Sequence, residues 1–317
     1  MVETLESTWE PPRTTAVAVS SHEVSIPKRS TTVATAGAGA SVAASLKSMP
    51  EGHTIHRLAR EQRPLFVGKK LRVSTIMERF DEQAALLDRR KLVGIDAVGK
   101  HLFYDFGAEL FLHVHLGLYG RVRSGSAAAP EPIGALRVRM ETPQAWLDIR
   151  GPAACDILGP EERDRILARL GPDPLRDDAE PERAYARIVK SRTSLAQLFM
   201  DQSVIAGIGN IYRAELLYRH GIDPFAPGSS LDRAVFDSAW ADLVKLMRAG
   251  VRAGRIVTTD PTDRPRAKGR VSRGDSFYVY GRTGEPCRRC GAIVESALVA
   301  GRTLYWCPRE QTSKPRT

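Results

Sequence analysis

The chain has 317 residues, enough for two modest domains and a small appendix, and its formal net charge is +10. Such an excess of Lys and Arg favours an anionic partner, most often nucleic acid, with a membrane surface as the alternative. No apolar run approaches the roughly 20 residues that span a bilayer, and the N-terminus lacks the basic and apolar regions of a secretion signal. We therefore expect a cytoplasmic protein without a membrane anchor.

Composition divides the chain into five parts. Residues 1–48 are rich in Thr, Ser, Ala and Val and offer little to bury, so we expect a disordered extension that is absent from the active protein. From Met49 onward the chain reads as globular. The expected boundaries are 49–160 for a β-rich domain, 161–257 for a helical domain, 258–275 for a basic linker and 276–317 for a cysteine-bearing hairpin.

In the β-rich part, residues 53–63 have helical spacing that stops near Pro64. Five short apolar or alternating runs follow and indicate a β-sandwich or barrel. They are Leu71–Ile76, Leu92–Val98, His101–Phe106, Leu110–His115 and Leu136–Met140. The Pro-, Gly- and Ala-rich residues 124–134 predict a surface loop.

After Gly159-Pro160 the periodicity becomes helical. The predicted helices are Glu161–Leu170, Pro181–Val189, Leu195–Met200, Ile211–His220 and Leu231–Ala249. Gly171 and Gly221 stand where helix C-caps are expected. The proline- and arginine-rich residues that follow predict the basic linker.

Three of the four cysteines lie near the C-terminus, in the pattern of a metal site rather than of a disulfide framework. Cys287 and Cys290 form a C-x2-C pair, and Cys307 follows after a segment long enough for a hairpin. A zinc ribbon needs four ligands, and Glu310 stands where a further cysteine would complete the second pair. We expect one structural Zn²⁺ held by these four residues; a hairpin that no longer binds metal is the alternative.

The segment DQSVIAGIGN at residues 201–210 places Gly207 and Gly209 in a tight apolar turn before a predicted helix. Glycines allow a close backbone approach, and the free N–H groups of the helix that opens near Asn210 suit a phosphate. Such turns often serve only packing, so the motif is weak by itself.

The segment MPEGH at residues 49–53 is an ordinary turn before a helix unless the chain is processed. Methionine is readily removed when proline follows, which would leave Pro50 as a terminal secondary amine. A terminal amine has a reference pKa near 8, so an appreciable fraction is neutral and nucleophilic. Such an amine can attack a sugar C1′ to form an iminium, as lysines do elsewhere.

Residues 49–311 resemble the formamidopyrimidine-DNA glycosylase/endonuclease VIII family. Four motifs occur in the family's order: MPEGH at Met49, GKHLF at Gly99, the glycine turn ending at Asn210, and the cysteine hairpin. The chain looks most like the actinobacterial endonuclease VIII branch. The resemblance implies an α+β multidomain fold with a β-sandwich, a helix–two-turns–helix domain and a zinc-finger-type β-hairpin.

The same resemblance implies a bifunctional DNA glycosylase and AP lyase of base excision repair. Pro50 would attack C1′ and displace the damaged base, and Glu51 would protonate the ring oxygen and then shuttle protons. Lys100 would act near the lesion phosphate, and Arg302 would grip the phosphates that flank the lesion. β-Elimination and then δ-elimination would leave a one-nucleotide gap.

Four further residues are implied contacts to DNA. Asn210 would bind a phosphate, and Arg192 would follow the backbone. Arg213 also flanks the glycine turn and could do the same, although a solvated helix face explains Arg192 and Arg213 equally well. Extruding a nucleotide leaves a hole in the duplex, and Leu118 and Tyr119 align with the family's intercalating wedge. The alternative is that both side chains belong to the core of the sandwich.

Three features depart from the family pattern: Glu310 replaces a cysteine, Thr54 replaces a glutamate of many relatives, and residues 1–48 precede Met49. If that extension stays attached, the nitrogen of Pro50 is an amide without a nucleophilic lone pair. A catalytically silent protein that binds damaged DNA is therefore the main alternative. A Mg²⁺-dependent nuclease is a second, although no acidic cluster at metal-binding spacing supports it.

The branch resemblance favours oxidised pyrimidines or abasic sites over 8-oxoguanine as targets. It also implies double-stranded DNA as the partner, a monomeric protein and association with the nucleoid.

Overall fold

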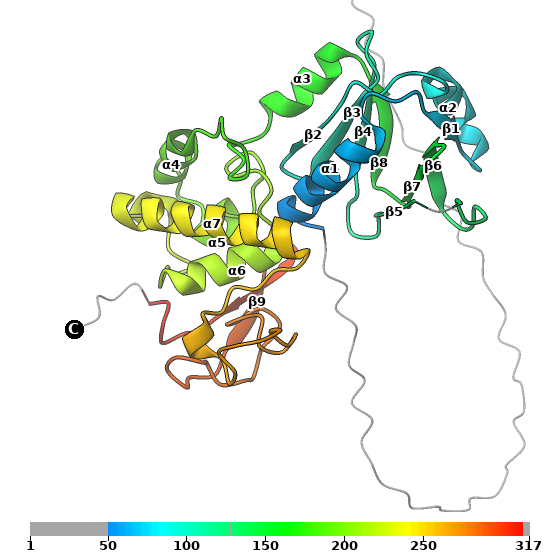
Figure 1. The fold of residues 1–317 in the computed structure, drawn as a ribbon. Coiled ribbons are helices and arrows are strands. Elements are labelled where there is room, and N and C mark those ends of the chain that lie inside the picture. The colour runs from blue at the N-terminus through cyan, green and yellow to red at the C-terminus, as the bar shows by residue number, and fades with distance from the viewer. Residues whose placement is uncertain (1–49, 127, 313–317) are drawn as a thin grey trace, which may run out of the picture. The chain divides into compact units, whose positions relative to one another are not determined.

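The computed structural model describes residues 50–126 and 128–312. The disorder expected for residues 1–48 lies outside the described residues, as does Met49 of the MPEGH segment. Figure 1 shows the order of the helices and strands along the chain. Among the described residues, no helix has both the length and the apolar character needed to cross a membrane.

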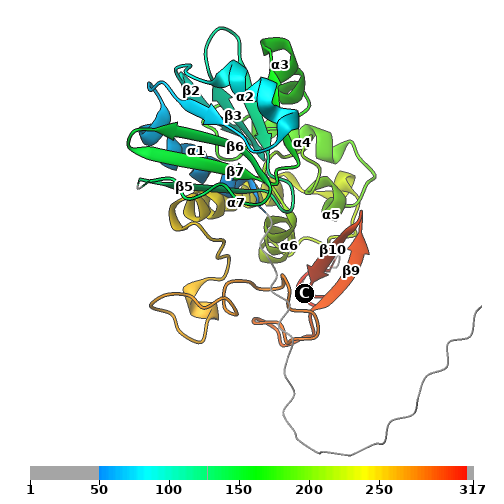
Figure 2. The same ribbon diagram turned by 90° about the vertical axis from the view of Figure 1, so that its right-hand side faces the viewer.

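The first region is a β-sandwich with one long helix along its side. Its elements are α1 (Gly52–Phe66), β1 (Arg72–Ser74), α2 (Asp81–Leu87), β2 (Gly94–Val98), β3 (His101–Asp105), β4 (Phe111–His115), β5 (Arg121–Gly125), β6 (Leu136–Thr142), β7 (Ala145–Arg150) and β8 (Ala154–Leu158). The strands form two antiparallel sheets, ordered β1-β6-β7-β5 and β2-β3-β4-β8. The two sheets lie over one another in Figure 2.

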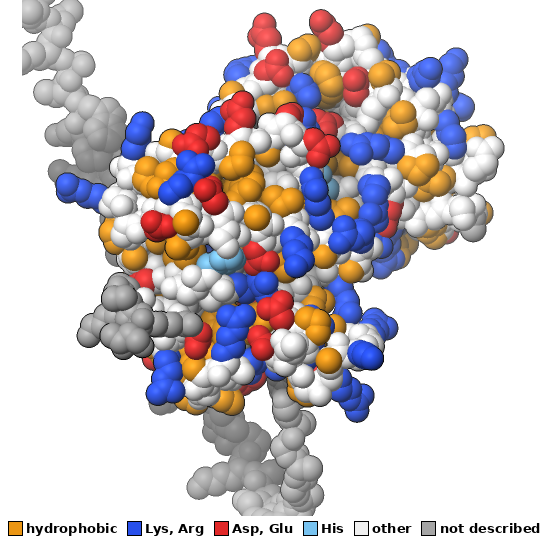
Figure 3. Space-filling model, turned by 60° about the vertical axis from the view of Figure 1, so that its left-hand side comes forward, with side chains coloured by type: hydrophobic (Ala, Val, Ile, Leu, Met, Phe, Trp, Pro, Cys, Tyr) orange, Lys and Arg blue, Asp and Glu red, His pale blue; other side chains and the backbone are white. Residues whose placement is uncertain are grey.

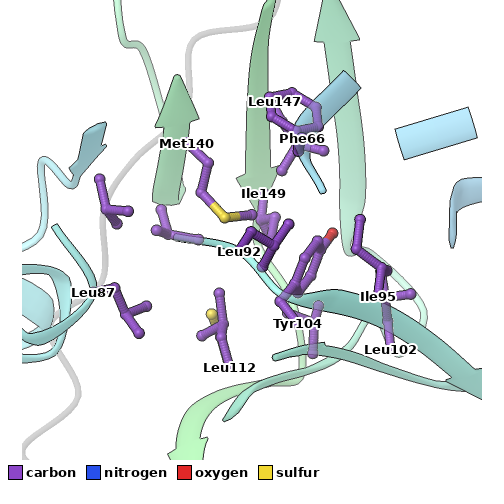
Figure 4. Packing of buried hydrophobic residues seen from close by; sticks show 14 of the residues in the cluster. Phe66, Leu87, Leu92, Ile95, Leu102, Tyr104, Leu112, Met140, Leu147 and Ile149 are labelled. Carbon is purple, nitrogen blue, oxygen red and sulfur yellow. The ribbon is translucent and has the colours of Figure 1, made fainter. Parts of the chain in front are cut away.

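Alternation along the strands places one face of each sheet in a shared core. Leu102 and Tyr104 of β3 are buried with Leu112 of β4, and they meet Leu147 and Ile149 from the other sheet (Figure 4). The phenol of Tyr104 donates a hydrogen bond of 2.7 Å to Gln62 Oε1 on α1. The core therefore fixes α1, whose first turn follows directly on Pro50 and Glu51.

The second region is helical and comprises α3 (Pro160–Ala168), α4 (Pro181–Val189), α5 (Leu195–Leu198), α6 (Asn210–Arg219) and α7 (Arg233–Ala253). The side chain of Asp232 caps α7 by accepting from the N–H groups of Ala234 and Val235, and Gly254 ends the helix at φ +69. Phe236, Leu243 and Met247 recur at helical spacing and are buried in the core of this region.

The last region is a two-stranded hairpin, β9 (Glu295–Val299) and β10 (Arg302–Trp306), preceded by an irregular segment. The buried carboxylate of Glu215, on α6, holds that segment in place. It accepts bonds of 2.8 Å from the backbone N–H groups of Tyr278, Val279 and Tyr280, and a further bond from the Thr258 hydroxyl. One charged group thus satisfies several buried donors at once.

The sequence predicts most of these elements. The five predicted strands of the first region and the five predicted helices of the second are confirmed to within a few residues. The elements α2, β5, β7 and β8 were not predicted. The predicted stop near Pro64 is confirmed to within two residues. The helix α1 ends at Phe66, so Pro64 lies in its last turn and removes only one backbone hydrogen bond. Gly221 does follow the end of α6 at φ +61. Gly171 is not a cap; an added Cβ there would lie 2.3 Å from Val204 O.

Candidate active site and nucleic-acid interface

Glu51 lies at the centre of the candidate site, against the start of α6. Its side chain is buried and accepts hydrogen bonds from the backbone N–H groups of Gly209 (2.9 Å), Ile211 (2.8 Å) and Tyr212 (3.4 Å). The sequence suggested a phosphate for these N–H groups. In the structure the anion at the helix N-terminus is instead the carboxylate of Glu51, which the helix dipole stabilises in the same way.

The glycines of the turn make this approach possible. A Cβ on Gly209 would lie 2.4–2.6 Å from the carboxyl end of Glu51, so a larger residue would displace it. Gly207 has φ +90, and its carbonyl accepts a bond of 2.8 Å from Gly52 N. The turn is thus built to receive residues 51 and 52.

Burial raises the pKa of the Glu51 carboxyl, although Lys100 and the N–H groups of α6 oppose that shift. Burial lowers the pKa of the Lys100 ammonium; Glu51 opposes this shift and Arg302 reinforces it. A carboxyl that keeps its proton more readily and an amine that loses one more readily suit a site for proton transfer. Pro50, half-buried, precedes the carboxyl directly.

The turn that carries Lys100 is held by Asp173, a residue that the sequence analysis did not identify. Gly99 has φ +60, and its N–H donates to Asp173 Oδ2 at 2.7 Å. The other contacts of this buried carboxylate are His56 Nε2 at 2.7 Å and the N–H of Leu175 at 2.9 Å. Asp173 therefore ties the lysine turn to α1 and to the helical region.

Arg302 is exposed at the start of β10, and its neighbour Thr303 is fixed to α6. Thr303 O accepts from Asn210 Nδ2 at 2.9 Å and from Arg213 Nη2 at 3.2 Å. Arg213 also donates to Asn210 Oδ1. In this structure Asn210 therefore bonds the hairpin through Thr303 O.

Arg213 is not the solvated or DNA-facing residue that its position in the sequence suggested. It is fully buried, and burial lowers the pKa of its guanidinium to about 10. Arg192, by contrast, is exposed in the segment between α4 and α5. Figure 3 shows Lys and Arg side chains spread across the middle of one face, as a polyanion partner requires.

Leu118 and Tyr119 lie at the tip of the turn between β4 and β5. Their exposed fractions are 41% and 80%, so the alternative that they belong to the core is wrong. Gly117 at φ +63 and a bond of 2.9 Å from Gly120 N to Leu116 O close the turn tightly. Two apolar side chains on a rigid exposed turn are suited to enter a base stack.

The three C-terminal cysteines come together as the sequence predicts. The sulfur atoms of Cys287, Cys290 and Cys307 all lie within 4.8 Å of one another, and no disulfide joins them. The hydroxyl of Tyr218 lies 3.1 Å from the sulfur of Cys287, where it can donate to a thiolate ligand. These three residues fit a structural Zn²⁺. The carboxylate of Glu310 does not belong to this cluster of ligand atoms.

Comparisons with known proteins agree with this geometry. The family model described as Formamidopyrimidine-DNA glycosylase N-terminal domain matches residues 49–155, and its H2TH domain model matches residues 170–262. A third model, described as Zinc finger found in FPG and IleRS, matches residues 284–309.

Among curated proteins, Endonuclease 8 1 of Mycobacterium tuberculosis is 46% identical over 278 residues, covering 83% of this chain and 100% of the relative. Formamidopyrimidine-DNA glycosylase of Geobacillus kaustophilus is 32% identical over 276 residues, with coverage of 83% and 100%. A solved complex of Lactococcus lactis Fpg with abasic-site DNA has the same fold, with a TM-score of 0.69 at 22% identity over 83% of this chain and 100% of that chain.

Fold and site together define a DNA repair enzyme with a buried acid, a half-buried lysine and an exposed apolar turn. The chain belongs to the formamidopyrimidine-DNA glycosylase/endonuclease VIII family, whose members are DNA glycosylases with AP lyase activity.

The contact between Glu51 and α6 gives the first prediction. Gly209→Ala should displace the carboxylate and leave buried N–H groups unpaired, at a cost of about 1–3 kcal/mol in the free energy of unfolding. Cleavage of abasic-site DNA should fall at least tenfold. Urea unfolding and a cleavage assay measure the two effects.

Gly159→Ala is the matched control, because a Cβ there meets nothing within 4 Å and its φ of −80 suits any residue. Equal stability and activity of the two variants would contradict the structural role of Gly209.

Proposed function

We propose that the chain removes oxidised bases from double-stranded DNA through a Schiff base to Pro50, and then nicks the strand. The amine nitrogen of Pro50 forms a bond to C1′ as the bond from C1′ to the base breaks. The base leaves with the electrons of that bond, and the nitrogen loses its proton. Glu51 then donates a proton to the ring oxygen, the bond from C1′ to that oxygen breaks, and the nitrogen lone pair forms an iminium with C1′. The observation that supports this most directly is the buried carboxyl of Glu51, held against the start of α6, next to Pro50 in the chain and near enough to Lys100 for each to shift the other's pKa.

Loss of a proton from C2′ then expels the 3′ phosphate, and a further elimination expels the 5′ phosphate. Lys100 would act near the lesion phosphate, and Arg302 would grip the flanking phosphates from the hairpin. Asn210 would reach a phosphate by exchanging its bond to Thr303 O, while Arg192 would follow the backbone. Leu118 and Tyr119 would fill the space left by the extruded nucleotide.

We propose domain boundaries at 49–160, 161–257, 258–275 and 276–317, with residues 1–48 outside the active protein. We infer a monomer that binds duplex DNA at the nucleoid, in the cytoplasm. The similarity to a protein named Endonuclease 8 1 supports this reading.

The Schiff base requires a free amine on Pro50. Protein that begins at Pro50 should form a covalent adduct with abasic-site DNA when borohydride is added, because reduction traps the iminium. Protein that retains residues 1–48 should form at least 100-fold less, since an amide nitrogen has no available lone pair. Gel electrophoresis of labelled DNA measures the adduct.

Pro50→Gly with a blocked terminus is the matched control and should form no adduct. Absence of an adduct from every start site would overturn the proposal in favour of a silent DNA-binding protein. Strand cleavage that EDTA abolishes would instead indicate a metal-dependent nuclease.

Oxidised pyrimidines are the proposed preferred lesions. Excision rates on a panel of duplexes should be at least tenfold higher for oxidised pyrimidines than for 8-oxoguanine opposite cytosine. The basis is the similarity to the endonuclease 8 relatives. Equal or faster removal of 8-oxoguanine would contradict this preference.

We propose that Zn²⁺ is held by Cys287, Cys290 and Cys307, with Glu310 turning in as the fourth ligand. The ion would brace the hairpin that carries Arg302. Cysteinate binds Zn²⁺ better than carboxylate in structural sites, so Glu310→Cys should slow the release of zinc to a chelator at least tenfold. Glu310→Ala should speed the release several-fold.

Zinc content by mass spectrometry and release to a coloured chelator measure both effects without an activity assay. Glu295→Ala, an exposed change in the same hairpin, is the control. Purified protein without zinc, or a Glu310→Ala variant that holds it as the wild type does, would contradict the ligand assignment.

A further inference from the structure

Residues 264–273, between α7 and the hairpin, form a strongly cationic segment that we name the basic loop. It contains Arg264, Arg266, Lys268, Arg270 and Arg273 and no acidic residue. None of these side chains belongs to the proposed catalytic centre. The charge of the loop therefore needs an explanation of its own.

Hydrogen bonds fix both ends of the basic loop. Thr258 N donates to Ser276 O at 2.9 Å, and the Thr259 hydroxyl donates to Asp275 O at 2.6 Å. Arg255, just beyond the end of α7, donates to Val271 O at 2.6 Å. With its ends joined in this way, the loop presents its middle in a defined place.

The middle of the loop holds three exposed cations, Arg266, Lys268 and Arg270. Within residues 50–126 and 128–312, these three side chains have no hydrogen bond or ion pair. Arg264, by contrast, bonds the Thr259 hydroxyl at 2.8 Å. Like charges gathered on a fixed loop repel one another unless an anion binds them, and a chain of phosphates is such an anion.

The base of the loop adjoins the catalytic centre. Burial raises the pKa of the Tyr280 hydroxyl; Glu51 raises it further and Arg273 lowers it, so both charges lie near this ring. In addition, Glu215 anchors the segment after the loop only five residues along α6 from Asn210, a rise of about 7.5 Å. A duplex bound at Glu51 would therefore pass close to the loop.

We propose that the basic loop is a phosphate clamp, which grips the DNA backbone beside the lesion without reading the base. The composition of the loop distinguishes these two roles. It has no aromatic side chain to stack on a base, and Ser272 is its only neutral side chain able to form hydrogen bonds. The proposal rests on DNA being the substrate, but it does not require the Schiff base.

The test removes three charges in the variant R266Q/K268Q/R270Q and measures binding to a duplex with a tetrahydrofuran abasic analogue and to an undamaged duplex. The logarithm of the association constant falls linearly with the logarithm of the salt concentration, and each lost phosphate contact makes this slope shallower by about 0.9. We therefore expect the slope to fall by about 2–3, with binding weakened roughly 10- to 100-fold at 0.1 M salt. Both duplexes should lose affinity by the same factor.

Two further variants complete the test. K70Q/R72Q/K91Q removes three exposed charges around β1, at the far edge of its sheet (Figure 1), and should leave the slope nearly unchanged. R266K/R270K keeps the charge and should keep the wild-type slope. Circular dichroism would verify that all three variants are folded.

A slope for the loop variant equal to that of the β1 control would overturn the proposal. So would an unchanged slope with an altered ratio of affinities for the two duplexes, which would mean that the loop recognises the lesion rather than the backbone. The measurement uses binding alone, so it remains decisive even where no borohydride adduct forms and the proposed chemistry fails.

Discussion

The carboxylate of Glu51, seated on the first N–H groups of α6, is the interaction on which the site depends. It joins the start of the globular chain to a helix more than 150 residues later. The helix dipole and three N–H donors stabilise the charged form, while burial favours the protonated form. Burial is the larger of the two effects, so the pKa of this carboxyl lies above its ordinary value.

The same helix also positions the other parts of the site. Asn210 and Arg213 bond the backbone of β10 beside Arg302, and Glu215 gathers the segment that leads to the hairpin. The lysine turn is linked to the helical region through Asp173. The acid and the lysine thus come from the first region and the arginine from the hairpin, and hydrogen bonds to the helical region fix the segments that carry them. Such a frame limits the loss of geometry when DNA binds.

Much of this could be predicted from the sequence because the relevant signals are local. Strand alternation gave the sandwich, and short motifs identified Glu51, the glycine turn and the cysteine pair. Exposure of Leu118 and Tyr119 also agrees with the wedge interpretation. These features depend on neighbours a few residues away, where periodicity and turn chemistry are informative.

What could not be predicted depends on contacts between distant residues. Asp173 bonds Gly99 and His56 across 74 and 117 residues, and no local pattern marks it as a partner. Arg213 looked solvated, but α6 is buried on nearly every side, so its guanidinium lies in the interior. The sequence also predicts a phosphate at the N-terminus of α6. Any anion can accept from the free N–H groups there, and only the fold shows that this anion is Glu51.

The distance along the chain between Glu51 and α6 has a consequence for how the protein is made. Pro50 and Glu51 leave the ribosome early, whereas Tyr212, 161 residues after Glu51, emerges last among its hydrogen-bond partners. At about 5–20 residues per second, that interval lasts roughly 8–30 s. During synthesis Glu51 is therefore present before the helix that binds its side chain, and the site can form only after α6 has emerged from the ribosome.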